Sequence, residues 1–348
     1  MSPHSQHSGS RSVGIIGAGL IGGSIALGLR KAGWSVAGVD PDPDVMDIAS
    51  ERGFFDKAHH TIDSLLSASP DLVVVAAPPT ATIDLVGSIQ FGGPIMDVAG
   101  VKVPVLAVAE DLPGFVGTHP MAGRETSGPR AASASLFKGA SWVVVEGGAD
   151  AAQEVVESAI ESLGARVVAM AADDHDAAVA AISHLPHLVA GALLSGATDT
   201  PAALDLAAGS FRDLTRVGAS APIPWVELLK TNRSPVLDAI GVLRDQLALF
   251  EAAIVTEDDT LLTMLSTSRE TRRSLGAPVT HVRVALADEP GELAKVGHAF
   301  EESGVDIRDI QMRHAPYGGG GVLTLSVRPG EESTLRDALE AAGLLLVR

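Results

Sequence analysis

The chain of 348 residues contains no cysteine. This absence excludes disulfide bonds, thiol nucleophiles and cysteine-ligated zinc sites, and it favours a cytoplasmic location. Basic residues are also scarce, because 25 lysines and arginines stand against 43 aspartates and glutamates and leave a formal net charge of −18. Such a surface argues against nucleic-acid binding, which needs basic residues to neutralise phosphates. An anionic substrate must therefore meet locally placed arginines.

Long apolar runs are missing as well. No stretch of 18 uninterrupted apolar residues occurs, so no membrane span is expected. Residues 1–10 are rich in serine and histidine and have no apolar segment, which predicts a disordered tail and not a signal peptide. With 46% hydrophobic residues, the remainder is long enough for two or three globular domains.

A glycine-rich turn near the start is the most informative stretch of the chain. Val13–Ile16 predicts a short buried strand, and Ile21–Leu29 has apolar residues at helical spacing. Between them the order Gly-x-Gly-x-x-Gly falls on a strand-to-helix turn, which is the context of a dinucleotide-binding motif.

Each glycine of this turn has a physical task. Gly17 allows the tight turn, Gly19 lets the backbone approach a pyrophosphate, and Gly22 lets the helix pack closely on its strand. The free N–H groups where the helix begins, at Leu20 and Ile21, attract phosphates. We therefore expect a dinucleotide at this turn.

The second predicted strand, Trp34–Val39, ends in Asp40, which lies 18 residues after Gly22. An acid at this place binds the ribose hydroxyls of NAD. No arginine stands nearby to bind a 2′-phosphate, and Asp42 would repel one. The sequence therefore predicts NAD in preference to NADP.

The apolar run Leu72–Ala77 suits a parallel strand that is buried on both faces. Strand carboxyl ends line the ligand crevice in doubly wound sheets, so Ala77 and Pro78 are expected beside the cofactor. Further strands fit residues 94–98, 115–117, 142–145 and 166–170. Together these elements predict an α/β fold with a Rossmann-type doubly wound sheet over residues 11–172.

From residue 173 to residue 276 the pattern is helical. Asp173 or Asp174 can cap the first helix. Helices are predicted near residues 175–194, 201–208, 225–232 and 234–255, and the polar stretch 265–277 is interpreted as a linker. The apolar faces of these helices need more cover than one copy supplies, which predicts a homodimer, with burial inside one chain as the alternative.

Residues 277–348 follow a β-α-β-β-α-β order. Strands fit residues 281–287, 305–312, 322–327 and 344–347, and helices fit residues 292–303 and 332–342. The glycines at 318–321 predict the hairpin turn between the two middle strands.

Several residues could take part in chemistry. His119 follows a predicted strand, and a neutral imidazole there could accept a proton from a substrate hydroxyl during hydride transfer. His184 and His187 flank a proline, but no acid or cysteine completes a metal site, so no metal is expected. Arg212 and Arg216 could grip a carboxylate or form ion pairs on a helix face.

Five motifs follow one another along the chain, namely the glycine turn with Asp40 and the segments 97–102, 118–123, 183–187 and 211–216. Their residues and their order resemble those of the prephenate and arogenate dehydrogenases of tyrosine biosynthesis. The resemblance extends from about Val13 to the end of the chain, and the final part, with residues 286–293, resembles an ACT domain, a module that senses amino acids.

The resemblance implies roles for individual residues. His119 resembles the catalytic histidine that hydrogen-bonds the ring hydroxyl of the substrate. His187 and Arg216 resemble polar groups that hold the substrate carboxylates, with Arg212 in the same motif and Trp225 at a nearby tryptophan position.

Three further residues follow from the same resemblance. Glu125 matches an acidic gate residue of the catalytic site, and His175 resembles a histidine that dimers offer to the substrate across their interface. Gly100 stands where the family usually has a serine that contacts the catalytic histidine and the cofactor. A water or another hydroxyl, such as that of Thr118, would have to replace that serine, or turnover would be slower.

The activity implied by the resemblance is NAD-dependent oxidative decarboxylation of prephenate to 4-hydroxyphenylpyruvate, with arogenate dehydrogenase as the alternative. Tyrosine is then the expected effector at the ACT segment. A β-hydroxyacid dehydrogenase is a second hypothesis. Such enzymes generally use a catalytic lysine in the helical domain, for which Lys230 is the single candidate, and the motif around His119 would then stay unexplained. A non-catalytic sensor of NAD and an amino acid is a third reading, favoured by Gly100.

Overall fold

The computed structural model describes residues 11–123, 126–200, 202–256, 258–275, 279–314 and 320–347. The chain forms two compact units that divide after Asp245, inside a long helix. Each unit is described by itself.

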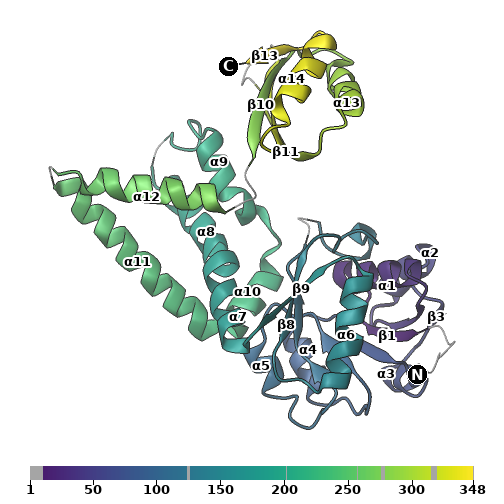
Figure 1. Cartoon of the computed structure of the whole chain (residues 1–348). Coiled ribbons are helices and arrows are strands. Elements are labelled where there is room, and N and C mark those ends of the chain that lie inside the picture. The colour runs from purple at the N-terminus through teal and green to yellow at the C-terminus, as the bar shows by residue number, and fades with distance from the viewer. Residues whose placement is uncertain are drawn as a thin grey trace, which may run out of the picture. The chain divides into compact units, whose positions relative to one another are not determined.

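A six-stranded parallel sheet is the centre of the first unit (Figure 1). Its order is β3-β2-β1-β4-β5-β6, which is the 3-2-1-4-5-6 order of dinucleotide-binding folds. The strands are β1 (Ser12–Ile16), β2 (Ser35–Val39), β3 (Lys57–Ala58), β4 (Leu72–Val75), β5 (Ile95–Asp97) and β6 (Phe115–Val116). The predicted doubly wound sheet is confirmed.

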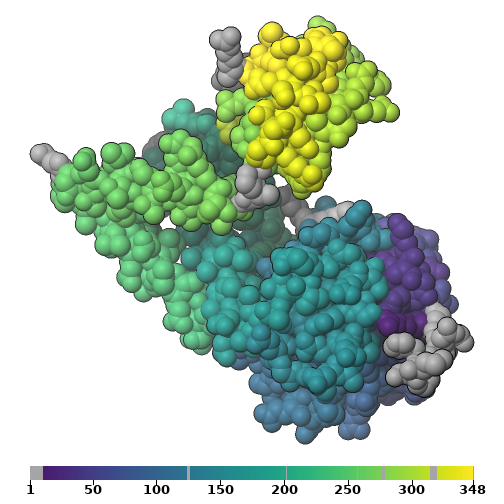
Figure 2. All heavy atoms as spheres, in the orientation of Figure 1, coloured from purple at the N-terminus to yellow at the C-terminus, as the bar shows by residue number. Residues whose placement is uncertain are grey.

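Helices cover both faces of this sheet, as the alternation along β4 shows. Leu72 and Val74 belong to the core on one side, whereas Val73 and Val75 belong to the core on the other. Helices α1 (Leu20–Lys31) and α6 (Asp150–Ser162) pack on the first side, and α3 (Ile62–Leu66), α4 (Pro79–Val86) and α5 (Val103–Leu106) on the second. In the space-filling view the teal atoms around α6 cover the face turned to the viewer (Figure 2). Helix α2 (Pro43–Glu51) follows β2.

A second, three-stranded sheet continues the nucleotide-binding part. It has the order β7-β8-β9, with β7 (Thr118–Pro120) antiparallel to β8 (Ser141–Val145) and β8 parallel to β9 (Arg166–Met170). A short 3₁₀ turn, η1, spans Pro129–Ala131. The register pairs His119 with Val143, so regular sheet hydrogen bonding fixes the backbone of this histidine.

The helical part begins with one bent helix. Helix α7 (Ala172–Val179) continues through a π-helical segment, η2 (Ala180–His184), into α8 (Leu185–Thr198). Pro186 has no N–H to donate, and the wider π turn before it absorbs the missing bond. The expected cap at Asp173 or Asp174 is wrong, because both lie in the first turn, where carboxylates favour the positive helix end without capping it.

The remaining helices of this part are α9 (Gly209–Thr215), the 3₁₀ turn η3 (Arg216–Ala219), α10 (Pro222–Thr231) and α11 (Arg233–Val255). The helix predicted over residues 201–208 is wrong, since residues 202–206 form turns and Ala202 has a φ of 61° that no helix tolerates. Helix α10 packs on α4 of the nucleotide-binding part, and the backbone N–H of Thr80 donates to Glu227 Oε1 at 2.6 Å.

In the second unit, α12 (Thr260–Ser274) lies where a linker was predicted. The prediction is wrong because leucine, methionine, arginine and glutamate form helices readily without an apolar stripe, and the segment has no internal glycine or proline.

The rest of the second unit matches the predicted β-α-β-β-α-β order. An antiparallel sheet has the order β11-β12-β10-β13, and α13 and α14 pack side by side on it (Figure 1). The elements are β10 (Thr280–Leu286), α13 (Glu292–Ser303), β11 (Ile307–His314), β12 (Gly321–Val327), α14 (Glu332–Ala341) and β13 (Leu345–Val347). Gly318 and Gly319 of the predicted glycine turn lie outside the described residues, and Gly321 begins β12.

One helix of the described chain, Ala172–Thr198, is long and apolar enough to cross a membrane by length and composition alone, although no membrane span was expected. One such helix is weak evidence for a membrane span, because the core helix of a soluble protein passes the same test.

Candidate active site

The glycine turn has the geometry that a dinucleotide requires. Gly17 has a φ of 99°, and a Cβ on it would lie 2.3 Å from the carbonyl oxygen of Ala76. A Cβ on Gly22 would lie 1.9 Å from the carbonyl oxygen of Gly17. A Cβ on Gly19, by contrast, would meet no protein atom within 4 Å, although Gly19 is the N-cap of α1. Two glycines thus serve the fold, and the third borders open space at a helix start.

Asp40 closes this turn from the end of β2. Its Oδ2 accepts the N–H of Ala18 at 2.7 Å, and its Oδ1 accepts the N–H of Asp42 at 3.0 Å. A carboxylate has about four acceptor positions, so both oxygens can still accept ribose hydroxyls. A cleft of about 640 Å³ lies beside it and is lined by Ile16, Gly17, Gly19, Val39, Asp40, Pro41, His60, Thr61, Ile62, Ala76, Ala77, Pro78, Ala81, Asp84 and Leu85.

The contrast between these glycines gives a test. Gly19→Ala should fold with a melting temperature close to that of the unmodified protein, because the new methyl group meets no protein atom. It should weaken NAD binding by at least roughly tenfold, because the methyl group occupies the space where the pyrophosphate approaches the backbone. Calorimetry with NAD measures the affinity. Gly17→Ala is the matched comparison and should lose stability, and unaltered NAD affinity in Gly19→Ala would place the cofactor elsewhere.

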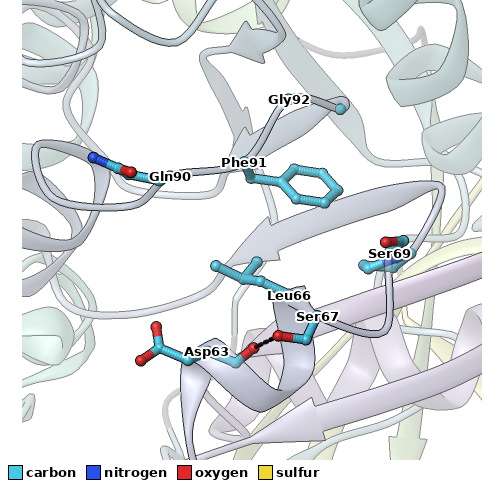
Figure 3. Close-up of a pocket in the computed structure, with 9 residues that line it drawn as sticks. Asp63, Leu66, Ser67, Ser69, Gln90, Phe91 and Gly92 are labelled. Carbon is cyan, nitrogen blue, oxygen red and sulfur yellow. Dashed lines mark hydrogen bonds between the residues drawn. The ribbon is translucent and has the colours of Figure 1, made fainter.

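Another hollow, of about 570 Å³, lies before the amino ends of β4 and β5 (Figure 3). Leu66 and Phe91 form its apolar surface, and the hydroxyl of Ser67 already donates to the carbonyl of Asp63 at 2.7 Å. Ligands of open α/β sheets bind at the carboxyl ends of the strands, so this hollow is not the candidate site.

A chain of hydrogen bonds runs back from His119. Its Nδ1 lies 2.9 Å from Nε2 of His175, and Nδ1 of His175 lies 2.7 Å from Oδ1 of Asp176. Both His175 and Asp176 are 1% exposed. Strand β7 supplies the first residue and helix α7 the other two, so the site joins the nucleotide-binding part to the helical part.

A buried ion pair lies next to this chain. Nζ of Lys102 contacts Oδ2 of Asp97 and donates to the carbonyl oxygen of Thr118 at 2.6 Å, and all three residues are fully buried. Asp97 also accepts the backbone N–H groups of Ala99 and Thr118. Burial lowers the pKa of Lys102, and the neighbouring carboxylate of Asp97 opposes that shift. Because Lys102 and Asp97 both bond to the backbone of Thr118, the ion pair anchors β7 to β5.

The buried surroundings of His119 and His184 keep both imidazoles neutral. Burial first, and then the positive charge of Lys102, hold the pKa of His119 well below its ordinary value. Burial lowers the pKa of His184 to about 4, although the carboxylate of Asp176 acts in the opposite direction. His119 is therefore a neutral base at physiological pH, as a group that accepts a proton from a hydroxyl must be.

His187 and Trp225 form a second cluster. Their rings stack with centroids 3.8 Å apart and an interplanar angle of 9°. Burial lowers the pKa of His187, and its buried Nδ1 has no hydrogen-bond partner among the residues that the structure describes. An unsatisfied buried nitrogen is unfavourable unless a ligand meets it.

Comparison with known proteins decides the family. Residues 25–169 match the model described as the nucleotide-binding domain of prephenate dehydrogenase, and residues 171–267 match the dimerization domain of prephenate dehydrogenase. A prephenate dehydrogenase of Lactococcus lactis is 34% identical over 254 residues, which are 68% of this chain and 70% of that protein. The chain belongs to the prephenate dehydrogenase family.

Two solved structures agree with this membership. Prephenate dehydrogenase from Aquifex aeolicus, in complex with hydroxyphenyl propionate and NAD+, has a TM-score of 0.70 at 27% identity and covers 78% of this chain and 100% of its own. Arogenate dehydrogenase from Synechocystis has a TM-score of 0.66 at 27% identity, and the match covers 76% of this chain and 100% of that structure's chain. The predicted family and its NAD-binding domain are confirmed, and the bent apolar helix lies within the dimerization domain.

Two expectations from the family pattern are wrong for this chain. His175 is not available across an interface, because its side chain is buried and bonded to His119 of the same chain. The hydroxyl of Thr118 cannot replace the missing serine at Gly100, because it donates to the carbonyl of Asp97 at 2.6 Å and accepts from Nε1 of Trp142 at 2.9 Å. Its side chain faces away from His119, as neighbours on a strand do.

The other predicted residues are placed as follows. Gly100 lies beside the imidazole, since a Cβ on it would lie 3.7 Å from Nε2 of His119. Arg216 begins η3, which packs on α8, the helix of His187, and Arg212 is exposed on α9. Glu125 lies outside the described residues.

Sequence reasoning missed Asp176 and Asn232. Nδ2 of Asn232 lies 2.9 Å from the carbonyl oxygen of Asp176 and 3.2 Å from Nδ1 of His184. The available signal was a third aspartate, directly after His175 in an alanine-rich helix, where a buried carboxylate needs partners.

Proposed function

We propose that the protein catalyses the NAD-dependent oxidative decarboxylation of prephenate to 4-hydroxyphenylpyruvate. The observation that supports this best is the neutral imidazole of His119, which is held from behind by His175 and lies beside Gly100. The alternative, a β-hydroxyacid dehydrogenase, does not explain a role for this histidine in the reaction.

The glycine turn and Asp40 fit NAD, because the open space at Gly19 borders the start of α1 and Asp40 keeps free acceptor positions. NAD supplies the acceptor for the hydride that leaves the ring carbon of the substrate. Nε2 of His119 accepts the proton of the ring hydroxyl, and we propose that His187 and Arg216 hold the carboxylates, with Glu125 as a gate. Loss of carbon dioxide makes the ring aromatic, so the reaction is effectively irreversible.

Arogenate is the second candidate substrate. It is favoured by the likeness to the Synechocystis arogenate dehydrogenase, and it presents the same ring hydroxyl and ring carboxylate to the site. The test is the initial rate of NADH formation with each compound at equal concentration. A higher kcat/KM with prephenate supports the proposal, a higher value with arogenate assigns the alternative, and no turnover with either favours a sensor.

The choice of cofactor follows from Asp40. We expect a kcat/KM for NAD at least roughly a hundredfold above that for NADP, because the 2′-phosphate would approach Asp40 and Asp42 with no arginine beside it. Steady-state assays with both cofactors measure the ratio. Asp40→Ser should reduce the ratio by improving NADP relative to NAD, and equal efficiencies in the unmodified protein would refute the assignment.

We infer that the protein is a cytoplasmic homodimer. The dimerization-domain match and the exposed apolar side chains on its helices support this, among them Ile182 at 67%, Ile223 at 80% and Val242 at 62%. Sedimentation of the full chain tests the oligomeric state.

We propose further that residues 277–348 are an ACT domain that binds tyrosine and inhibits the enzyme. The antiparallel β-α-β-β-α-β unit supports this, together with the turn at 288–291, where Gly291 has a φ of 99°. We expect tyrosine to bind the full chain and to lower its rate, with a coupling of about 1–3 kcal/mol. Calorimetry and inhibition assays at millimolar tyrosine check this, and the absence of both effects would leave the unit a structural module.

A further inference from the structure

The starting point is the carboxylate of Asp176, which accepts hydrogen bonds at both oxygens. The backbone N–H of Lys102 donates to Oδ1 at 2.7 Å, and that of Val103 donates to Oδ2 at 2.9 Å. Backbone amides can only donate, so both oxygens of Asp176 act as acceptors.

The acceptor oxygen of Asp176 decides where His175 carries its proton. Nδ1 of His175 lies 2.7 Å from Oδ1 of Asp176, so Nδ1 donates. With this proton on Nδ1, the neutral form of the imidazole, which is 1% exposed, has a lone pair on Nε2.

The lone pair on Nε2 of His175 in turn decides which nitrogen of His119 carries the proton. Its Nδ1 lies 2.9 Å from the bare Nε2 of His175 and so carries the proton, which leaves its own Nε2 bare. That nitrogen lies 3.7 Å from the place that a Cβ on Gly100 would take, and glycine has no hydroxyl to orient it. The orientation and tautomer of this imidazole therefore depend on the bonds behind it.

We propose that Asp176 and His175 are positioning residues that fix His119 as the Nδ1–H tautomer. The consequence for the reaction rests on the proposed function: a bare Nε2 accepts the proton of the substrate hydroxyl, so the O–H bond breaks and an Nε2–H bond forms while the hydride leaves the ring. In the opposite tautomer Nε2 would present an N–H to that hydroxyl and could not act as the base.

Nitrogen NMR of the full chain, labelled with ¹⁵N-histidine and without substrate, reads the tautomer directly. The His119 signals are identified by their loss in His119→Asn. We expect a protonated Nδ1 and a bare Nε2 for His119 in the unmodified protein. His175→Phe should release this preference, whereas His175→Gln should keep it, because the amide oxygen can accept the Nδ1–H bond.

Kinetics supply the second readout. His175→Phe should lower kcat on the order of 10²-fold, with KM for the substrate changed by less than about threefold, and His175→Gln should recover most of the loss. A His119 with its proton on Nε2 in the unmodified protein overturns the proposal, even if a variant fails to fold. An unaltered tautomer and kcat in His175→Phe also overturn it.

The two proposals can fail separately. If the unmodified protein oxidises neither prephenate nor arogenate but shows the expected tautomer of His119, the proposed function is wrong and the positioning role of His175 and Asp176 stands. If turnover is normal and the tautomer is the opposite one, the positioning role is wrong and the proposed function stands.

Discussion

His119→Asn is expected to lower kcat by roughly 10²–10⁴-fold, the range for loss of a positioned acid–base group. Asparagine keeps a polar side chain of similar reach but cannot accept a proton at neutral pH. KM for prephenate should change little, because the carboxylates of the substrate are held elsewhere in our proposal. Steady-state NADH formation at saturating NAD measures both constants.

The control for this variant is His298→Asn, which alters a histidine whose side chain is 76% exposed on α13. It should leave kcat and KM unchanged. Near-normal turnover in His119→Asn would remove this histidine from the chemistry, whereas a large rise in KM with unchanged kcat would make it a binding residue.

Arg216→Ala is expected to act mainly on substrate affinity. Loss of a desolvated bidentate pair with a carboxylate costs about 2–5 kcal/mol, and since Arg216 is exposed in the single chain we expect the lower end, a rise in KM of roughly 30-fold. Initial rates over a range of prephenate concentrations measure this rise.

Arg216→Lys separates the geometry of the guanidinium from its charge. Lysine keeps the positive charge but cannot form two parallel hydrogen bonds, so most of the rise in KM should remain. An unchanged KM in Arg216→Ala would instead favour an ion pair on the helix face, which was the alternative from the sequence.

The nucleotide-binding half was predictable because its signals are local. The glycine turn, the buried strand at Leu72 and the acid at Asp40 follow from spacing and apolar pattern, and they recur as β1, α1, β2 and β4. Helix α13 has the predicted bounds, Glu292–Ser303, because Gly291 and Gly304 both adopt positive φ at its ends.

The catalytic surroundings were less predictable because they depend on contacts between distant segments. His119 and His175 are separated by 56 residues, and Lys102 and Asp176 by 74. No local sequence pattern predicts a contact between residues so far apart in the chain. The helix α12 was missed for the opposite reason, since its residues favour a helix individually without an apolar stripe.

The most direct test of the proposed function is the stoichiometry of a single reaction with prephenate and NAD. We expect NADH, carbon dioxide and 4-hydroxyphenylpyruvate to form in a ratio of 1:1:1, and His119→Asn to form all three roughly 10²–10⁴-fold more slowly. NADH without carbon dioxide, or no product while NAD still binds, would contradict oxidative decarboxylation at this site.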